Sequence, residues 1–260
     1  MKNKGTKEGT AQEIEFVKLL NNKKDLGYWN TLSLTSNNHY AIRIISKKYG
    51  ILNESKVLPK ADAFIAKGSV PLEYLKSKGH FLDEKDVKKF DLEPIAKSGI
   101  SIKRADSKQY QIMKMRPSTF KKLFGSNILA SGASIYCTKE IEFSKNKKLL
   151  EAWGVDSREF INYFSQELDI SFTSLTDSKS KDTLKAIKNF SNIKIAEVIN
   201  TNKQISDFIF FGIGNFEEPF TAHWLYVHGE FKANYLIPFS VTTGSGRSKG
   251  IYTIVLKPKN

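Results

Sequence analysis

The sequence predicts an α/β (α+β) protein with a mixed central β-sheet flanked by helices. Three observations predict this class: apolar residues at helical spacing near the N-terminus, amphipathic segments in the middle, and short aromatic and β-branched runs in both halves. With 260 residues, of which 40% are hydrophobic, the chain can sustain a packed core. We expect one compact body over residues 1–260, with a core at about 10–145 and a second half at about 146–260.

The first predicted helix follows a polar tail at residues 1–9. Thr10 and Glu13 have capping-box spacing, and the next residues place an apolar stripe on one helix face, formed by Ile14, Val17 and Leu20. At about 100° per residue, Glu13 falls beside this stripe. We therefore expect its side chain to be partly turned inward.

Short apolar runs follow this helix. Residues 29–34 and 40–46 predict either two strands or a strand and a short helix, and residues 58–68 predict a strand that contains Asp62. Residues 70–97 are rich in both charges and predict a solvated surface helix. Residues 99–117 alternate apolar and polar side chains on either side of 105–108, which predicts a hairpin.

The remaining elements are helices followed by strands. We expect a short helix at residues 118–124 closed by Gly125, and longer helices at 148–168 and 181–190. Aromatic and β-branched runs at 205–213, 223–231, 234–243 and 251–259 predict strands of a second sheet or of a sheet extension. This order of elements favours one mixed α/β architecture.

The charge of the chain favours a polyanionic partner. The formal net charge is +14 and the pI is about 9.6, which suits nucleic acid if the cations gather on one face. The alternative is that lysine merely solubilises the surface. The single cysteine, Cys137, excludes an internal disulfide, and no apolar run is long enough for a signal peptide or a membrane span. We expect a soluble, cytoplasmic protein with no membrane partner.

A carboxylate and a lysine are the candidate catalytic groups. Hydrolysis of a phosphodiester requires an oxygen-bound divalent cation, a positioned water and charge stabilisation. Asp62 and Lys103 on adjacent strands would lie side by side, and Lys103 shares its strand face with Ser101. The alternative is a turn carboxylate and an ordinary surface lysine.

A strand aspartate followed by the hairpin Ser101-Ile102-Lys103 resembles the PD-(D/E)xK nuclease superfamily, particularly type II restriction endonucleases, over residues 10–125. The resemblance implies Mg²⁺-dependent cleavage of double-stranded DNA and a restriction-endonuclease-like core. It implies metal binding by Asp62, Glu13 and the backbone carbonyl of Ile102, and support of the attacking water by Lys103. The C-terminal half would then recognise the target.

Two departures from the family pattern bear on this assignment. One is the unusually long insertion that separates Asp62 from Ser101, and the other is Ser101 itself. Ser101 stands where a second acid is usual, so we expect one firmly held Mg²⁺, with Glu13 compensating and Ser101 acting through a hydrogen bond. Acid-x-Lys triplets also occur elsewhere in this lysine-rich chain, as at Asp106-Ser107-Lys108. Only 101–103 lies within an alternating apolar strand, and this context favours it.

Several polar residues are candidate DNA contacts. They occur near the proposed site and in a glycine-serine loop, and comprise Arg43, Arg104, Gln109, Gln111, Lys114, Arg247, Ser248 and Lys249. Because duplex targets are often palindromic, a homodimer is plausible. The competing functions are a non-catalytic nucleic-acid-binding module and a nuclease of repair or of structured substrates.

Overall fold

The computed structural model describes residues 4–22, 26–45, 59–104, 109–138, 142–244 and 252–259. The chain is a mixed α/β protein, as predicted, and forms two compact units. Unit 1 comprises Met1–Lys108 and Asp207–Ile237, and unit 2 comprises Gln109–Ser206 and Pro238–Asn260. Each unit is therefore assembled from two separate stretches of chain. The boundary expected near residue 145 lies inside unit 2.

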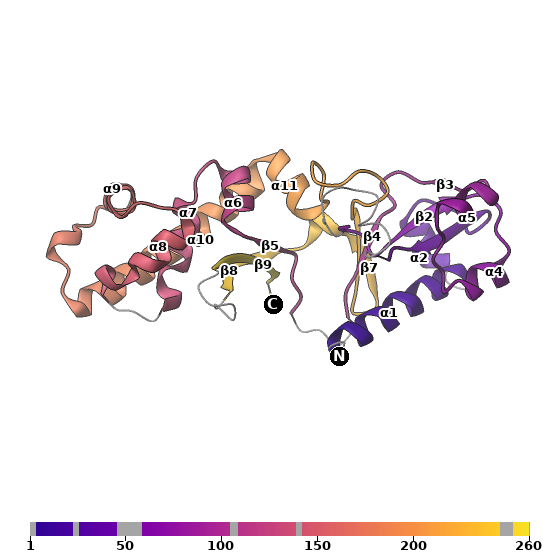
Figure 1. Ribbon diagram of the computed structural model, residues 1–260, viewed down its shortest axis with the longest axis horizontal. Helices are drawn as coiled ribbons and strands as arrows, with labels where there is room; N and C mark the ends of the chain where they lie inside the picture. Colours follow the sequence, from indigo (N-terminus) through magenta and orange to yellow (C-terminus); the bar gives the residue numbers. More distant parts are fainter. Residues whose placement is uncertain are drawn as a thin grey trace. The chain divides into compact units, whose positions relative to one another are not determined.

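The sheet of unit 1 has the strand order β1-β2-β4-β6-β7, with β3 beside β2. Figure 1 labels β2, β3, β4 and β7 of this sheet. Its strands are β1 (His39–Arg43), β2 (Ala63–Lys67), β3 (Glu93–Pro94), β4 (Ile100–Ile102), β6 (Trp224–Val227) and β7 (Glu230–Ala233). Only β4 and β6 pair in parallel, so the sheet is mixed as predicted. Strands distant in sequence therefore meet at the centre of one sheet.

Helix α1 (Lys4–Asn21) packs on one face of this sheet. Its Val17 and Leu20 join Ala63, Ile65 and Ile100 in one core cluster. The expected polar tail is wrong from residue 4 onward, because α1 begins at Lys4 rather than after Thr10. The short helix α2 (Leu26–Thr31) precedes β1, which confirms the strand-and-helix alternative for this stretch.

The opposite face of β2 packs against the segment between β2 and β4. Phe64 and Ala66 lie in a second core cluster with Leu75 and Leu82, because successive strand residues point to opposite faces. The segment contains α4 (Leu72–Ser77) and α5 (Glu84–Lys89). Unit 1 thus has a three-layer arrangement, with α1 on one side of the sheet and this segment on the other.

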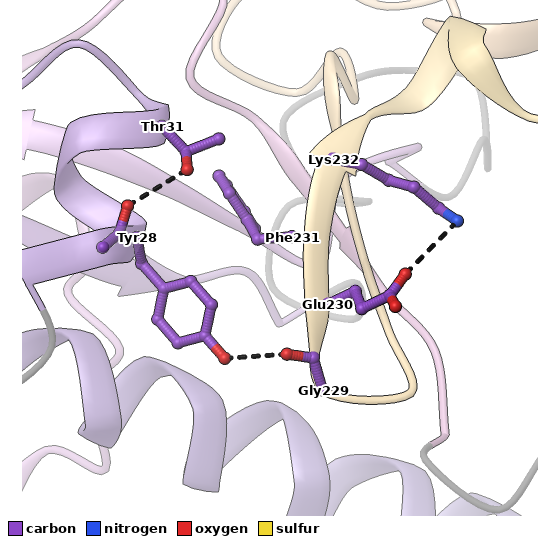
Figure 2. Close-up of a pocket in the computed structure, with 7 residues that line it drawn as sticks. Tyr28, Thr31, Gly229, Glu230, Phe231 and Lys232 are labelled. Carbon is purple, nitrogen blue, oxygen red and sulfur yellow. Dashed lines mark hydrogen bonds and ion pairs between the residues drawn. The ribbon is translucent and has the colours of Figure 1, made fainter.

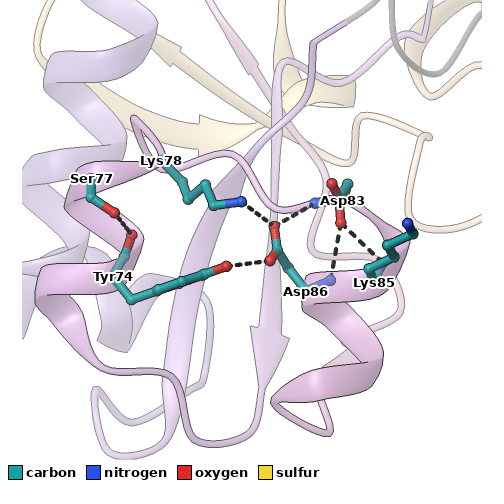
Figure 3. A network of polar contacts seen from close by, with 6 residues as sticks. All are labelled: Tyr74, Ser77, Lys78, Asp83, Lys85 and Asp86. Atoms are coloured by element: carbon teal, nitrogen blue, oxygen red, sulfur yellow. Dashed lines mark hydrogen bonds and ion pairs between the residues drawn. The ribbon is translucent and has the colours of Figure 1, made fainter.

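The expectation of one solvated helix at residues 70–97 is wrong. Asp86 is only 5% exposed, and its carboxylate accepts a hydrogen bond from the Tyr74 hydroxyl at 2.5 Å and pairs with Lys78 at 3.4 Å (Figure 3). Asp83 caps α5 by accepting bonds from the backbone amides of Lys85 and Asp86. Charges that the sequence pattern assigns to solvent instead join the two short helices.

Unit 2 contains a three-stranded antiparallel sheet in the order β5-β9-β8 and most of the helices. The strands are β5 (Met113–Met115), β8 (Phe239–Gly244) and β9 (Thr253–Pro258). The helices are α6 (Pro117–Phe124), α7 (Ile128–Ile135), α8 (Lys147–Trp153), α9 (Ser157–Leu168), α10 (Asp177–Thr201) and α11 (Lys203–Phe210), the last crossing into unit 1. No described helix is long and apolar enough to cross a membrane.

The predictions for the second half have mixed outcomes. Helix α6 ends at Gly125, whose φ of 77° suits glycine, as predicted. The helix predicted at 148–168 is interrupted at Gly154, which adopts the left-handed conformation with φ of 63°. The strand predicted at 205–213 is wrong, because apolar residues there recur at helical spacing and form α11.

Gly99 permits the close packing of β4 against the segment that leads into β6. A Cβ atom there would stand 1.7 Å from the backbone oxygen of Thr221. We expect Gly99→Ala to lower the free energy of unfolding by about 3 kcal/mol or more, because a backbone atom cannot yield as a side chain can. Denaturant titration measures this loss.

The matched control is Gly9→Ala in α1, where a new Cβ meets nothing within 4 Å. Alanine favours the helix by about 0.5–1 kcal/mol, so this variant should be slightly more stable than wild type. Equal stability of the two variants would contradict the close approach at Gly99.

Candidate active site

Asp62 lies directly before β2, held between β1 and β4. Its backbone amide donates to Ile100 O at 2.8 Å, and its carbonyl accepts from the Ile44 amide at 2.8 Å. Its carboxylate Oδ2 accepts a bond from the Ile102 amide at 2.7 Å and one from Ser101 Oγ at 3.3 Å. The Ile102 amide is thus bonded by a carboxylate oxygen rather than by a backbone carbonyl of the neighbouring strand, and this bond fixes the carboxylate against β4.

Lys103 follows β4 and continues its pairing with β6, since its amide donates to Tyr226 O at 2.8 Å. It acts electrostatically on Asp62 and lowers the pKa of that carboxyl, while burial, the larger influence, raises it. The structure therefore brings Asp62 to Ser101, Ile102 and Lys103, which follow it about 40 positions later in the chain. Ser101 itself is buried, at 3% exposure, and serves the aspartate.

Glu13 reaches the same place from α1. Its pKa is raised to about 7, first by burial and then by the negative charge of Asp62, with Arg43 and Lys103 acting in the opposite direction. Its side chain is half-buried, which confirms the expected inward orientation. A carboxyl that titrates near neutrality beside a second carboxyl is typical of catalytic and metal-binding sites.

Arg43 lies at the end of β1 and interacts with Glu13. Burial lowers the pKa of the guanidinium and Glu13 raises it. Its Nε atom is buried and has no hydrogen-bond partner among the described residues. The sequence suggests Arg43 as a DNA contact on an outer surface, whereas the structure places it beside the acidic groups of this site.

Lys60 is a member of the site that the sequence analysis missed. The pKa of Lys60 is lowered to about 7, first by burial and then by the positive charge of Lys103, while the charge of Asp62 acts in the opposite direction. Its Nζ donates to Ile209 O at 2.9 Å, in the last turn of α11. The spacing of two between Lys60 and Asp62 in an extended run is the pattern that could have indicated it.

These groups form a charged cluster, defined here as Glu13, Arg43, Lys60, Asp62 and Lys103. Among the described residues no group of three His, Cys, Asp or Glu side chains could hold a metal ion. Mg²⁺, however, keeps several waters and is commonly bound through one or two carboxylates. Two coupled carboxylates and the Ile102 carbonyl fit that donor set, and they do not fit the nitrogen and sulfur ligands of structural zinc.

The other predicted contacts are dispersed. Arg104 is half-buried just beyond β4. The predicted hairpin is wrong, because β4 belongs to the sheet of unit 1 and β5 to that of unit 2, so Gln109, Gln111 and Lys114 belong to unit 2. The local alternation was correct on both sides of the turn, but it does not specify the partner strand. Arg247, Ser248 and Lys249 lie outside the described residues.

Two other features of unit 1 are chemically distinct from the charged cluster. A pocket of about 420 Å³ lies between α2 and the start of β7, where the Tyr28 hydroxyl donates to Gly229 O at 2.9 Å. Figure 2 shows the residues that line it. Separately, Glu218 accepts bonds from Thr221 Oγ1 at 2.7 Å and the Lys97 amide at 2.9 Å, and it pairs with His223. The bonds of Glu218 order the segment entering β6.

No known family model matches the chain, and no curated protein matches its sequence. The chemistry of the residues themselves therefore carries the assignment of function.

The raised pKa of Glu13 predicts a pH-dependent cost to stability. Between about pH 4.5 and 7 the folded state holds a proton that the unfolded state releases, so stability falls as the pH rises through this window. Relative to wild type, Glu13→Gln should gain about 2 kcal/mol between pH 4.5 and pH 8 in metal-free buffer, after allowance for partial exposure. Denaturant titrations at both pH values measure this gain.

Glu15→Gln is the matched control, because Glu15 lies on the same helix and is exposed. It should follow the wild-type pH profile. A gain of equal size in both variants would show that Glu13 has no special environment.

Proposed function

We propose that this protein is a Mg²⁺-dependent endonuclease that hydrolyses double-stranded DNA, of the type II restriction class that the sequence resembles. The observation that carries the proposal is the convergence of Asp62, Lys103 and Glu13, from three separate segments, into one charged cluster. The mixed sheet with α1 on one face is compatible with the core that the resemblance implies.

Asp62, Glu13 and the Ile102 carbonyl would hold the metal. When bound, Mg²⁺ would supply Lewis-acid stabilisation of the charge that develops on the scissile phosphate. Ser101 and the Ile102 amide hold Oδ2 of Asp62, which leaves the other carboxylate oxygen to face the ion. The neutral serine at position 101 limits the negative charge of the site, so Glu13 supplies the second carboxylate.

Lys103 and Arg43 would act on the reacting groups. The Lys103 ammonium would hold and orient the attacking water, and the half-buried Arg43 guanidinium would donate to a phosphate oxygen. Without metal Glu13 has a pKa of about 7, so metal binding near neutral pH would release its proton. Lys60, with a pKa of about 7, would carry part of a positive charge at neutral pH, opposite in sign to that of Asp62.

Two alternatives use the same basic protein differently. A non-catalytic binding module is favoured by the net charge of +14, which alone suffices for phosphate contacts. A nuclease of repair or of structured substrates would share the charged cluster but would lack base-specific contacts.

A substrate panel separates the three functions. Supercoiled plasmid, linear phage DNA and branched oligonucleotides are incubated with the protein in Mg²⁺ or in EDTA. Discrete fragments of plasmid and phage DNA in Mg²⁺ alone support the restriction class. Preferential cutting of branched substrates supports the structure-specific class, and retardation without cutting supports the binding module.

A further inference from the structure

Two of the three longest stretches of the chain without an acidic residue lie mostly in unit 2. The first spans residues 107–139 and the second spans residues 231–260, whereas the other, residues 26–53, belongs to unit 1. Unit 2 has 19 basic and 10 acidic residues, against 22 and 17 in unit 1. Unit 2 therefore carries +9 of the net charge of +14 and unit 1 carries +5, so the larger share of the positive charge lies outside the charged cluster.

The fold brings these stretches together as the sheet β5-β9-β8. Strand β5 comes from the first stretch, and β8 and β9 come from the second. Antiparallel register places Lys114 opposite Val255, which in turn lies opposite Thr242. All three strands thus come from acid-free sequence.

One face of this sheet is packed, and the other carries cations around Thr253 and Val255 of the middle strand, which are themselves buried. Met115, Ile254 and Leu256 share the packed face and are fully buried, where α7 contacts β9 and α10 contacts β8 (Figure 1). On the other face Lys114 is exposed, and Arg116, two residues further along the extended chain, is also exposed.

The same outer face is completed by partly exposed residues of β8 and β9. Ser240 and Lys257 lie opposite each other, and Thr242 lies beside them on β8. We define the basic sheet face as Lys114, Arg116, Ser240, Thr242 and Lys257. It presents three cations on paired strands, while the hydroxyls of Ser240 and Thr242 donate to the β9 carbonyls of Lys257 and Val255.

We infer that the basic sheet face is the surface on which unit 2 docks duplex DNA. Lysine, arginine, serine and threonine are the side chains that contact phosphates, and sheets serve as DNA-docking elements in several protein classes. The large exposed apolar residues of the described chain are Ile193, Ile213, Tyr235 and Leu236, none of them on this face. This composition suits a phosphate backbone better than a lipid surface or an apolar protein partner.

The inference rests on the proposed function, because it names the surface that holds the substrate of the charged cluster. The surface is nonetheless independent of the chemistry, since phosphate contacts require no metal. Binding in EDTA therefore tests the basic sheet face, whereas cleavage in Mg²⁺ tests the cluster.

The experiment compares two triple variants of the full-length protein. Binding to a fluorescent duplex of about 30 base pairs is measured by anisotropy in EDTA over a range of salt. The combined variant K114Q, R116Q and K257Q should bind on the order of 100-fold more weakly at about 0.1 M salt, and its log-log salt slope should be shallower by about 2.7. Thermal unfolding checks that the variant is folded.

The matched control removes the same charge elsewhere in unit 2, through K179Q, K181Q and K185Q on exposed positions of α10. It should bind within about threefold of wild type. Equal weakening of both variants, or wild-type binding by the sheet variant, would overturn the inference. Tighter binding of wild type to anionic vesicles than to DNA would also overturn it.

A second measurement needs no variant. Acetylation of lysines in wild-type protein, read by mass spectrometry with and without duplex DNA, should show protection of Lys114 and Lys257 but not of Lys181 and Lys185. The reverse pattern would contradict the inference. If the wild-type protein binds DNA through this face but does not cleave it, the proposed nuclease activity is refuted and the docking surface is not. If the wild-type protein cleaves DNA and the sheet variant binds it normally, the docking surface is refuted and the nuclease activity is not.

Discussion

Lys103→Ala is expected to reduce the rate of plasmid cleavage in Mg²⁺ on the order of 1,000-fold while leaving DNA binding in EDTA within about threefold of wild type. The side chain acts electrostatically on Asp62 within the charged cluster, where it lowers the pKa of that carboxyl. Loss of a group that holds the attacking water or stabilises transition-state charge costs about 100- to 10,000-fold. The measurement is single-turnover cleavage with enzyme in excess.

Lys67→Ala is the matched control, since Lys67 is an exposed lysine at the far end of β2. It should cleave at the wild-type rate. Parallel loss of cleavage and binding in Lys103→Ala would instead assign Lys103 to binding. Full cleavage by Lys103→Ala would remove it from the mechanism.

Asp62→Asn is expected to abolish Mg²⁺-dependent cleavage, by about 1,000-fold or more, and to raise the thermal midpoint in metal-free buffer. The asparagine oxygen can still accept the bond from the Ile102 amide, but a neutral amide binds Mg²⁺ poorly. Burial raises the pKa of Asp62, so its ionised form costs folding free energy at neutral pH. Removing that charge should raise Tm by about 2–4 °C.

The control is Asp91→Asn, because Asp91 is exposed and its positive φ of 47° is accessible to asparagine. It should change neither cleavage nor Tm. A drop in Tm for Asp62→Asn would mean that the Asp62 charge stabilises the fold. Retained cleavage would exclude Asp62 as a metal ligand.

The proximity of Asp62 to Lys103 could be predicted because it depends on short-range rules. Apolar runs predicted a strand around each of the two residues, and helical periodicity turned Glu13 inward. The fold class followed from the same patterns. These features depend only on neighbours within a few positions of each residue.

The pairing of strands could not be predicted in the same way. Strand β4 pairs with β6, more than 120 positions later, and β5 pairs with β9, about 140 positions later. Alternation shows that a segment is a strand, but it does not identify the partner, so the nearest candidate gave a hairpin that the fold does not contain. Lys60 was missed because a lysine is most often solvated, and nothing in the sequence marks this one as buried.

Helix α11 was mistaken for a strand because its isoleucine and phenylalanine content outweighed its spacing. Ile205, Phe208 and Ile209 are all buried and recur at intervals of three and four, which is helical periodicity. Composition alone is a weaker guide than period in such short apolar runs. Lys60 also donates a hydrogen bond to Ile209 O in the last turn of this helix. A strand prediction for this segment therefore could not reveal that it contacts the charged cluster.

Cleavage of plasmid DNA by the wild-type protein and by Lys103→Ala, each in Mg²⁺ and in EDTA, tests the central claim most directly. We predict discrete fragments from the wild-type protein in Mg²⁺ alone, with intact DNA in the other three samples. DNA that stays intact in all four samples, and is retarded in a gel equally with and without EDTA, would contradict the nuclease and leave a DNA-binding protein.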